Sequence, residues 1–207
     1  MNRPGSIERI GLAELVVSPP RIARLRALLS RGGVAAVPTE TFYALAADPM
    51  NERGVSRIFE IKGRDRDQPL LVLFSDPAQL GPLRVAVASL DRFLGIWPAP
   101  LTVVLQLRSP IAASSGGETL AVRMPAAPGL RQLLSAVGPL TGTSANRSGD
   151  TPLADPDAVA QELGSDLDLL VEDGPTAGGE PSTIVDATRE PVRVLRRGAF
   201  RWPEPEK

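Results

Sequence analysis

The sequence alternates short, continuously apolar runs with longer segments whose apolar residues recur at helical spacing. Runs of the first kind are typical of strands that are covered on both faces, and segments of the second kind are typical of amphipathic helices that pack on a sheet. No repeat period relates the segments, and the 21 Pro and 19 Gly residues lie mostly at their borders. The alternation therefore predicts an α/β fold with a mixed, twisted sheet and flanking helices.

The borders of the segments set the expected limits of each element. Asn51 is a suitable cap for a helix that Lys62 closes, and Gly63 suits the exit from that helix. The other helices are expected at 18–32, 85–97, 129–137 and from 155 onward, with a short capped turn at 75–80. Strands are expected at 34–37, 70–74, 101–107, 119–122, 140–143, 167–171, 183–185 and 192–195.

Composition narrows the chemistry more than it narrows the fold. The 207 residues include no Cys and no His, which excludes disulfides, thiolate metal sites, cysteine nucleophiles, imidazole ligands and a Ser-His-Asp triad. Asp, Glu, Lys, Tyr and hydroxyl groups are left to carry any reaction. The net charge of -1 gives no overall attraction to nucleic acid or anionic membrane, so an RNA contact would need a local patch.

Length and hydropathy indicate one cytoplasmic domain. A chain of 207 residues can bury a full core, although this length could also hold two small domains. No stretch has the composition of a linker, so we expect a single domain over residues 1–207. The N-terminus lacks the charged start and unbroken apolar run of a signal peptide, and no stretch approaches the ~18 apolar residues of a membrane span. We therefore expect a cytoplasmic location and no contact with a membrane.

The segment 36–74 contains many polar and cationic residues, which lie between the expected core strands 34–37 and 70–74. Lys62 closes the expected helix, and Arg64 and Arg66 follow it before the next strand begins. Cations at a helix C-terminus are often only a solvated end that interacts with the helix dipole. However, Lys62 and Lys207 are the only lysines of a chain that otherwise uses Arg. Lys62 therefore indicates a task that suits a compact ammonium, such as phosphate contact.

Further polar residues stand at the ends of expected strands. Arg123 is placed where backbone pairing stops, so its guanidinium could grip a carboxylate with two parallel hydrogen bonds, or could pair with an acid such as Glu118. Thr41 follows the first apolar run. Ser144 and Asn146 lie in a turn-forming run, where such residues often bond only their own backbone. Each of these residues, taken singly, is compatible with a structural role.

Taken together, these motifs resemble the signature of the YrdC-like threonylcarbamoyl-AMP synthases. The resemblance covers roughly residues 20–200 and rests on several motifs that occur in the expected order. They are Pro38-Thr39-Glu40-Thr41-Phe42-Tyr43, Lys62-Gly63-Arg64, Gln68-Pro69-Leu70, Trp97-Pro98-Ala99-Pro100-Leu101-Thr102, Ala121-Val122-Arg123-Met124-Pro125, Thr143-Ser144-Ala145-Asn146-Arg147-Ser148-Gly149, Ser182-Thr183-Ile184-Val185-Asp186 and Leu195-Arg196-Arg197-Gly198.

The resemblance implies a YrdC/RibB-like fold with a positively lined, concave cavity, in the short form of the family that lacks an added C-terminal domain. It implies an L-threonylcarbamoyladenylate synthase, a nucleotidyltransferase that converts L-threonine, bicarbonate and ATP to threonylcarbamoyl-AMP and pyrophosphate for tRNA modification. Mg²⁺ would arrive with ATP. Implied partners are tRNA or double-stranded RNA and the proteins that transfer the threonylcarbamoyl group.

The resemblance also implies roles for individual residues. Lys62 and Arg64 would be the catalytic cations, and no residue would bind a metal directly. Threonine would be held by Thr41, Arg123 and Ser182, with backbone around Thr141 and Gly142. ATP would be surrounded by Lys62, Arg64, Gln68, Thr119, Ser144, Asn146, Thr151 and Arg196. Because Lys62 is expected to be solvated in the cavity, alanine there is expected to lower turnover about tenfold or more and to leave the fold intact.

Several positions depart from the family pattern. Leu73 stands where His is common and cannot form a side-chain hydrogen bond. Gln68 stands where Asn is usual, and Ala44 and Ala46 replace Gly residues, so each adds a methyl group that could crowd a backbone approach. These departures concern the amino acid pocket more than the phosphate site.

Two other functions remain open at this point. A catalytically altered paralogue could bind nucleotide, or could bind RNA through Arg64, Arg66, Arg147, Arg196 and Arg197, although aromatic residues for base stacking are few. A carbamoyl-transfer relative acting on another acceptor is also conceivable. The family's carbamoyltransferases are large multidomain proteins, however, and this chain stops shortly after Arg197.

Overall fold

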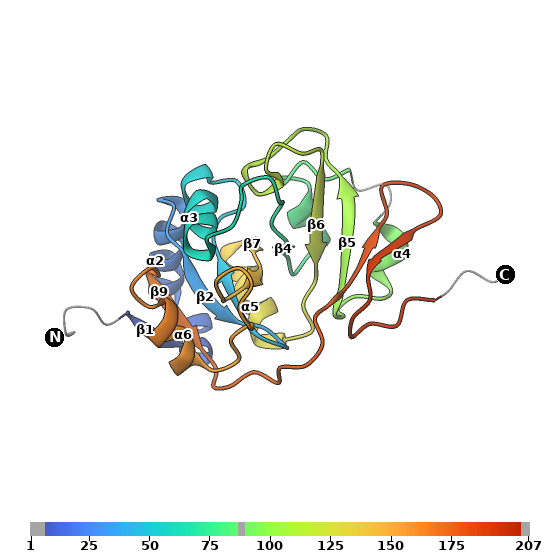
Figure 1. Ribbon diagram of the computed structural model, residues 1–207. Helices are drawn as coiled ribbons and strands as arrows, with labels where there is room; N and C mark the ends of the chain where they lie inside the picture. Colours follow the sequence, from blue (N-terminus) through green and yellow to red (C-terminus); the bar gives the residue numbers. More distant parts are fainter. Residues whose placement is uncertain (1–6, 87–89, 204–207) are drawn as a thin grey trace.

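A computed structural model describes residues 7–86 and 90–203 and has an α/β architecture with two mixed sheets (Figure 1). The first sheet has the strand order β1-β9-β2-β3-β8. Its β1, β9 and β2 run parallel, and β2, β3 and β8 pair antiparallel. Its strands are β1 (Arg9–Gly11), β9 (Leu169–Glu172), β2 (Ala35–Pro38), β3 (Tyr43–Ala46) and β8 (Thr143–Ser144).

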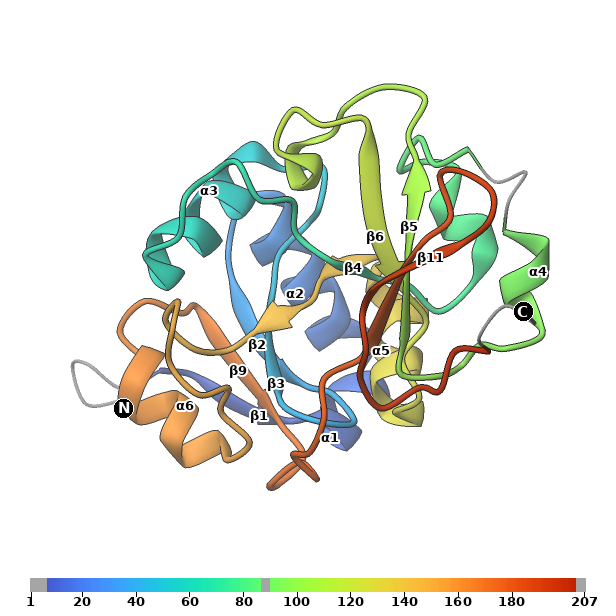
Figure 2. The ribbon, with the colours of Figure 1, turned by 45° about the vertical axis from the view of Figure 1, so that its right-hand side comes forward.

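The second sheet has the order β11-β10-β5-β6-β4-β7. Its β10 pairs parallel with β5, and β4 pairs parallel with β6, whereas the other neighbours are antiparallel. Its strands are β11 (Arg193–Arg196), β10 (Thr183–Asp186), β5 (Leu101–Gln106), β6 (Thr119–Arg123), β4 (Val72–Leu73) and β7 (Leu140–Thr141). The two sheets lie side by side, as the view turned by 45° shows (Figure 2).

Helices cover the first sheet on both faces. They are α1 (Leu12–Val16), α2 (Pro19–Ser30), α3 (Glu52–Lys62), α5 (Pro128–Val137) and α6 (Pro156–Leu163). The short helix α4 (Asp91–Leu94) and the 3-10 turns η1 (Pro77–Leu80) and η3 (Ala112–Ser114) lie in connections near the second sheet. No helix in the part of the chain that the structure describes is long and apolar enough to cross a membrane.

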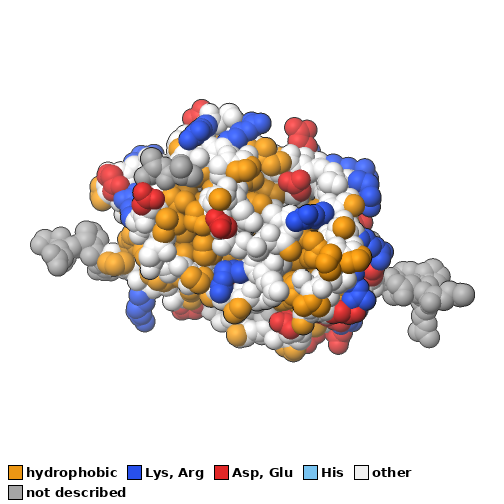
Figure 3. Space-filling view, turned by 180° about the vertical axis from the view of Figure 1, so that it is seen from behind, with side chains coloured by type: hydrophobic (Ala, Val, Ile, Leu, Met, Phe, Trp, Pro, Cys, Tyr) orange, Lys and Arg blue, Asp and Glu red, His pale blue; other side chains and the backbone are white. Residues whose placement is uncertain are grey.

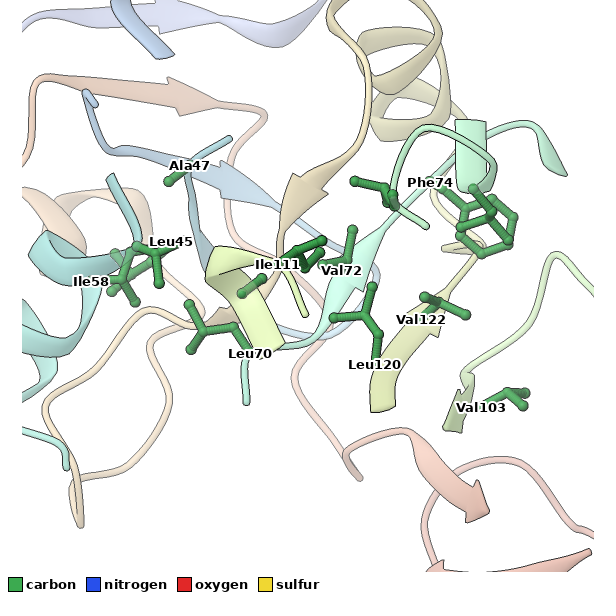
Figure 4. Packing of buried hydrophobic residues seen from close by; sticks show 14 of the residues in the cluster. Leu45, Ala47, Ile58, Leu70, Val72, Phe74, Val103, Ile111, Leu120 and Val122 are labelled. Atoms are coloured by element: carbon green, nitrogen blue, oxygen red, sulfur yellow. The ribbon is translucent and has the colours of Figure 1, made fainter. Parts of the chain in front are cut away.

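The alternation of side chains along β2 and β3 explains this arrangement. Ala35, Val37 and Ala44 pack in a cluster with α1, α2 and α5, whereas Ala36 and Leu45 belong to a second cluster that extends to α3, α6 and the second sheet. Successive strand residues point to opposite faces, so a continuously apolar run is buried on both. Figure 4 shows Leu45 and Ile58 packed toward Leu70 and Val72 in the second cluster.

Most predicted elements are confirmed, because their borders carry local signals. The Asn51 side chain accepts hydrogen bonds from the backbone N–H groups of Arg53 and Gly54, and Gly63 has a left-handed backbone with φ of 58°. The turn at 75–80 is capped by Asp76 as expected. The predicted α/β class is also confirmed, but its strands form two sheets where one was expected.

The predicted helix at 85–97 is wrong apart from α4. Val85 pairs with Leu107 in an isolated bridge, and the Ala86 N–H donates to the Gln106 oxygen. This stretch is therefore extended and pairs with the C-terminal end of β5. Residues 87–89, also in the predicted helix, lie outside the described residues. The predicted strand 70–74 is shorter, at Val72–Leu73, and β1, α1 and β3 were not predicted. The single strand predicted at 140–143 is wrong, because β7 belongs to the second sheet and β8 to the first.

Candidate active site

A cavity of about 900 Å³ lies where the two sheets meet. Its wall combines the turn between β2 and β3, the C-terminal end of α3, the ends of β5 and β6, and the segments before β10 and after β8. Most residues predicted to bind substrate line it. They are Lys62, Arg64, Gln68, Ser144, Asn146 and Arg196 from the predicted ATP set, and Thr41, Arg123, Gly142 and Ser182 from the predicted threonine set.

Three predicted residues do not line this cavity: Thr119, Thr141 and Thr151. The Thr141 hydroxyl accepts a hydrogen bond from the Ala47 N–H at 2.9 Å and donates to the Leu45 oxygen at 3.2 Å. Thr141 therefore fastens β7 of the second sheet to β3 of the first, and its hydroxyl is used within the protein. Contact of Thr119 and Thr151 with a nucleotide stays a prediction.

Lys62 is not solvated, so the expectation stated above is wrong. The residue is 4% exposed, and Nζ donates to the backbone oxygens of Ser144 at 2.7 Å and Asn146 at 2.9 Å, and to Oδ1 of Asn146 at 3.3 Å. An ammonium has three donor protons, so these three acceptors account for all of them. Lys62 therefore fastens the end of α3 to the segment that follows β8.

The Asn146 side chain is also hydrogen-bonded within the protein through both its oxygen and its nitrogen. Its Oδ1 accepts from the Ser144 hydroxyl at 2.5 Å, and its Nδ2 donates to the backbone oxygens of Arg147 at 2.7 Å and Asp150 at 2.9 Å. Local bonding of this kind was one of the two sequence interpretations. Lys62, Ser144 and Asn146 thus form one network that shapes the cavity wall, and their contact with ATP stays a prediction.

Arg64 follows two residues after Lys62 but is free of such bonds. Among the described residues, no hydrogen bond or ion pair of its guanidinium is found, and its Nε is buried without a partner. Burial lowers the pKa of Arg64, and the nearby Asp67 opposes that effect. Because an arginine remains charged at neutral pH, Arg64 presents an uncommitted cation to the cavity.

Arg123 is a second cation with uncommitted donors. It ends β6, is 5% exposed, and lies 3.3 Å from Glu40 between Nη1 and Oε1. Burial lowers the pKa of Arg123, Glu40 raises it, and Arg196 lowers it further. Pairing with an acid was one of the two interpretations of Arg123, and in the structure the acid is Glu40, whereas Glu118 was the example given. Sequence reasoning did not assign a role to Glu40, although it lies within the quoted motif around Thr41.

Hydroxyl groups and a third arginine also line the cavity. Arg196 Nη2 donates to the Ser182 oxygen at 2.8 Å, and the hydroxyls of Ser182 and Thr102 lie 2.8 Å apart. Burial lowers the pKa of Arg196. Thr102 also lines the cavity and was not predicted as a site residue, because a hydroxyl within an apolar strand carries no separate signal.

Gly142 forms part of the cavity wall directly over Leu73, the residue that replaces the usual His. Leu73 is fully buried and packs in the cluster beneath α5, so it supports Gly142 from behind and is not itself among the lining residues. Of the two alanines in place of Gly, Ala44 lines the cavity and Ala46 is buried in the same cluster as Leu73.

Substitution of Gly142 by Ala is expected to lower the free energy of unfolding by about 2 kcal/mol. A Cβ at this position would lie 2.5 Å from Cγ and 2.7 Å from Cδ1 of Leu73, whose side chain is fully buried. Urea denaturation measures the effect. Gly95→Ala is the matched control, because no atom lies within 4 Å of a Cβ there and its φ is -76°; equal stability of both variants would contradict the packing described.

Two of the five arginines proposed for RNA contact form ion pairs with acidic residues of the protein. Arg66 pairs with Glu60 at 3.2 Å, and Arg147 pairs with Asp166 at 3.1 Å. On the face seen in Figure 3, Lys and Arg side chains are scattered among acidic and apolar ones. No group of three or more acidic residues that could hold a metal ion is found in residues 7–86 and 90–203. RNA binding remains an untested prediction.

Comparison with known proteins gives consistent results. A family profile for Sua5, YciO and YrdC, described as telomere recombination, matches residues 27–198. The chain is 37% identical over 197 residues to a threonylcarbamoyl-AMP synthase of Bacillus subtilis (strain 168), covering 90% of this chain and 56% of that protein. It is 35% identical over 177 residues to one of Vibrio vulnificus (strain YJ016), covering 82% and 94% respectively.

Solved structures agree with these matches. The structure of Pyrococcus abyssi Sua5 complexed with L-threonine has a TM-score of 0.80 and 31% identity, over 93% of this chain and 57% of that chain. Escherichia coli YciO has a TM-score of 0.76 over 95% of this chain and 96% of that chain, and at 23% identity it supports the fold alone. The chain spans about half the length of the Bacillus and Pyrococcus synthases, at 56% and 54%.

Proposed function

Because the chain belongs to the Sua5, YciO and YrdC family, we propose that it is an L-threonylcarbamoyladenylate synthase. It converts L-threonine, bicarbonate and ATP to threonylcarbamoyl-AMP and pyrophosphate. The observation that carries the proposal is the presence in one cavity of two guanidinium groups, of Arg64 and Arg123, whose N–H donors form no hydrogen bond among the described residues. One suits the phosphates of a nucleotide and the other suits the carboxylate of an amino acid.

The reaction needs no covalent group from the protein. The threonine amine attacks bicarbonate or CO₂, forming a C–N bond, and with bicarbonate a water leaves. An oxygen of the resulting carbamate then attacks the α-phosphorus of ATP, and the bond to pyrophosphate breaks. The protein supplies orientation and positive charge, which a chain without His and Cys can provide.

In this scheme Arg64 binds the phosphate chain, and Arg123 with Thr41 and Ser182 binds threonine. Lys62 holds Ser144 and Asn146 in place beside the nucleotide. Mg²⁺ would be carried by the ATP phosphates, a role that fits a cavity without an acidic ligand cluster among the described residues. The product would pass, in the cytoplasm, to proteins that transfer the threonylcarbamoyl group to tRNA.

The test is mass spectrometry of the products after incubation of the pure protein with ATP, L-threonine and bicarbonate, together with an assay of pyrophosphate. We expect threonylcarbamoyl-AMP, and pyrophosphate release that requires both threonine and bicarbonate. Pyrophosphate release that is independent of either would count against the proposal. Nucleotide binding without any product would favour the catalytically altered paralogue.

Nucleotide binding is expected to weaken as pH rises through about 8. Burial, together with the nearby Arg64, lowers the pKa of Lys62 to about 8. Above that pH the amine becomes neutral, so it loses its positive charge near the phosphates and one of the three donors that hold Ser144 and Asn146. An anionic ligand favours the charged form, so affinity is highest below the pKa of the free protein.

The measurement is calorimetric titration with a non-hydrolysable ATP analogue between about pH 7 and about pH 9.5, a range that spans the pKa of Lys62. Lys62→Arg is the comparison, because its guanidinium does not titrate in this range. A wild-type affinity that stays constant over the range would contradict this prediction.

A further inference from the structure

An ion pair joins the two sheets beside the cavity. Glu40 lies in the turn 39–42 between β2 and β3 of the first sheet, and Arg123 ends β6 of the second. Nη1 of Arg123 is 3.3 Å from Oε1 of Glu40, and their side chains are 6% and 17% exposed. Arg123 lines the cavity, but Glu40 does not. The reaction scheme given above uses Arg123 and leaves Glu40 without a role.

The turn that carries Glu40 is fixed by Thr39. The Thr39 hydroxyl accepts from the N–H groups of Thr41 at 3.2 Å and Phe42 at 3.3 Å, and it donates to the Phe42 oxygen at 2.7 Å. The Thr39 N–H also donates to the Phe42 oxygen at 3.1 Å. Hydroxyl bonds of this kind lock a short turn. The backbone of Glu40 is therefore held in one conformation, and its side chain is directed to Arg123.

Stability does not account for this pair. Both carboxylate oxygens of Glu40 and the Nε of Arg123 are buried without a hydrogen-bond partner among the described residues. A buried ion pair offsets the cost of removing two charges from water only when its geometry is good and its remaining polar atoms are satisfied. Here those atoms are not satisfied. Groups that cost stability beside a cavity call for a functional explanation.

We propose that Glu40 is a positioning residue, which holds the Arg123 guanidinium where the carboxylate of the amino acid substrate binds. The proposal rests on the proposed function. A two-pronged bond to Glu40 would occupy one edge of the Arg123 guanidinium, with two of its five N–H donors, and the absence of an acid would leave a buried guanidinium uncompensated. A single contact at 3.3 Å does neither. It keeps the cation in place by charge attraction and leaves its donors available for the substrate.

The test is a double-mutant cycle on L-threonine binding, measured by calorimetry in wild type, Glu40→Gln, Arg123→Met and the double variant. Glu40→Gln is expected to raise the Kd for threonine about tenfold, and to leave the Kd for a non-hydrolysable ATP analogue nearly unchanged. In the Arg123→Met background the same change is expected to have little further effect, because Glu40 acts through Arg123. Glu60→Gln is the matched control, since it breaks an exposed ion pair with Arg66.

Two results would overturn the proposal. One is an unchanged threonine Kd in Glu40→Gln, and the other is an equal loss in both backgrounds. If Glu40→Gln does not fold, Glu40→Asp replaces it, because it keeps the charge and withdraws it by one methylene. An intermediate loss of threonine affinity is then expected, and wild-type affinity would overturn the proposal.

A ligand-free measurement separates this proposal from the proposed function. If the wild type binds no L-threonine, the proposed function fails, and Glu40 is judged by the NMR signal of the Arg123 Nε–H group. A sharp, slowly exchanging signal is expected in wild type, and a broadened or fast-exchanging one in Glu40→Gln. The same signal in both proteins would show that Glu40 does not hold Arg123.

Discussion

Replacement of Arg64 by alanine is expected to lower kcat/KM for ATP by about a hundredfold or more and to leave the free energy of unfolding nearly unchanged. The guanidinium has no hydrogen bond or ion pair among the described residues, and its Nε is buried without a partner. Its removal therefore breaks no hydrogen bond or ion pair within the protein. Negative charge builds on the phosphate oxygens as pyrophosphate leaves, and in the proposed reaction Arg64 is the cation that neutralises that charge.

The measurement is initial-rate kinetics of pyrophosphate release, with urea denaturation of the same variants. Arg64→Lys keeps the charge but loses the two-pronged geometry, so an intermediate rate is expected. Arg24→Ala serves as the control, because Arg24 pairs with Glu8 in an exposed position on another part of the surface. Wild-type kinetics in Arg64→Ala would remove Arg64 from the mechanism.

Those parts of the fold that depend on neighbouring residues could be predicted from the sequence. The limits of α3 follow from a cap at Asn51 and a left-handed exit at Gly63, which are both local. The motifs also identified most residues of the cavity wall. By contrast, the division of the strands into two sheets depends on which short strands pair. Pairings such as β4 with β6 join residues that are distant in sequence, for example Val72 and Val122.

The same limit applies to the chemistry of the site. Lys62 and Arg64 appear alike in sequence, as two cations after one helix. The structure separates them, because the acceptors that bury Lys62 come from residues 144 and 146. A role for Glu40 could not be predicted from the sequence for a similar reason. An acid in a turn is usually solvated, and only the fold brings it to Arg123.

Because Lys62 is hydrogen-bonded within the protein and Arg64 is not, we expect a different result for a change at Lys62. Lys62→Met is expected to lower the free energy of unfolding by about 3 kcal/mol, and also to weaken ATP binding. Methionine retains most of the buried volume but removes the donor that three acceptors on Ser144 and Asn146 share, and among the described residues the Asn146 backbone oxygen has no other donor. In the part of the chain that the structure describes, the segment that follows β8 then keeps only two bonds to the end of α3, from the Ser148 N–H to the Lys62 oxygen at 2.7 Å and from Arg147 Nη1 to the Ile61 oxygen at 3.0 Å. This replaces the earlier expectation that a change at Lys62 leaves the fold intact.

Urea denaturation and calorimetric titration with an ATP analogue measure the two effects in Lys62→Met and Lys62→Arg. Lys62→Arg keeps the charge, but a planar guanidinium cannot direct its donors to three convergent acceptors, so we expect part of the stability to be lost and part of the affinity to remain. Arg64→Ala is the informative comparison, because there the rate falls without a loss of stability. A Lys62→Met protein as stable as wild type would contradict the structural role, since an ammonium bound only to phosphate contributes nothing to folding in the absence of ligand.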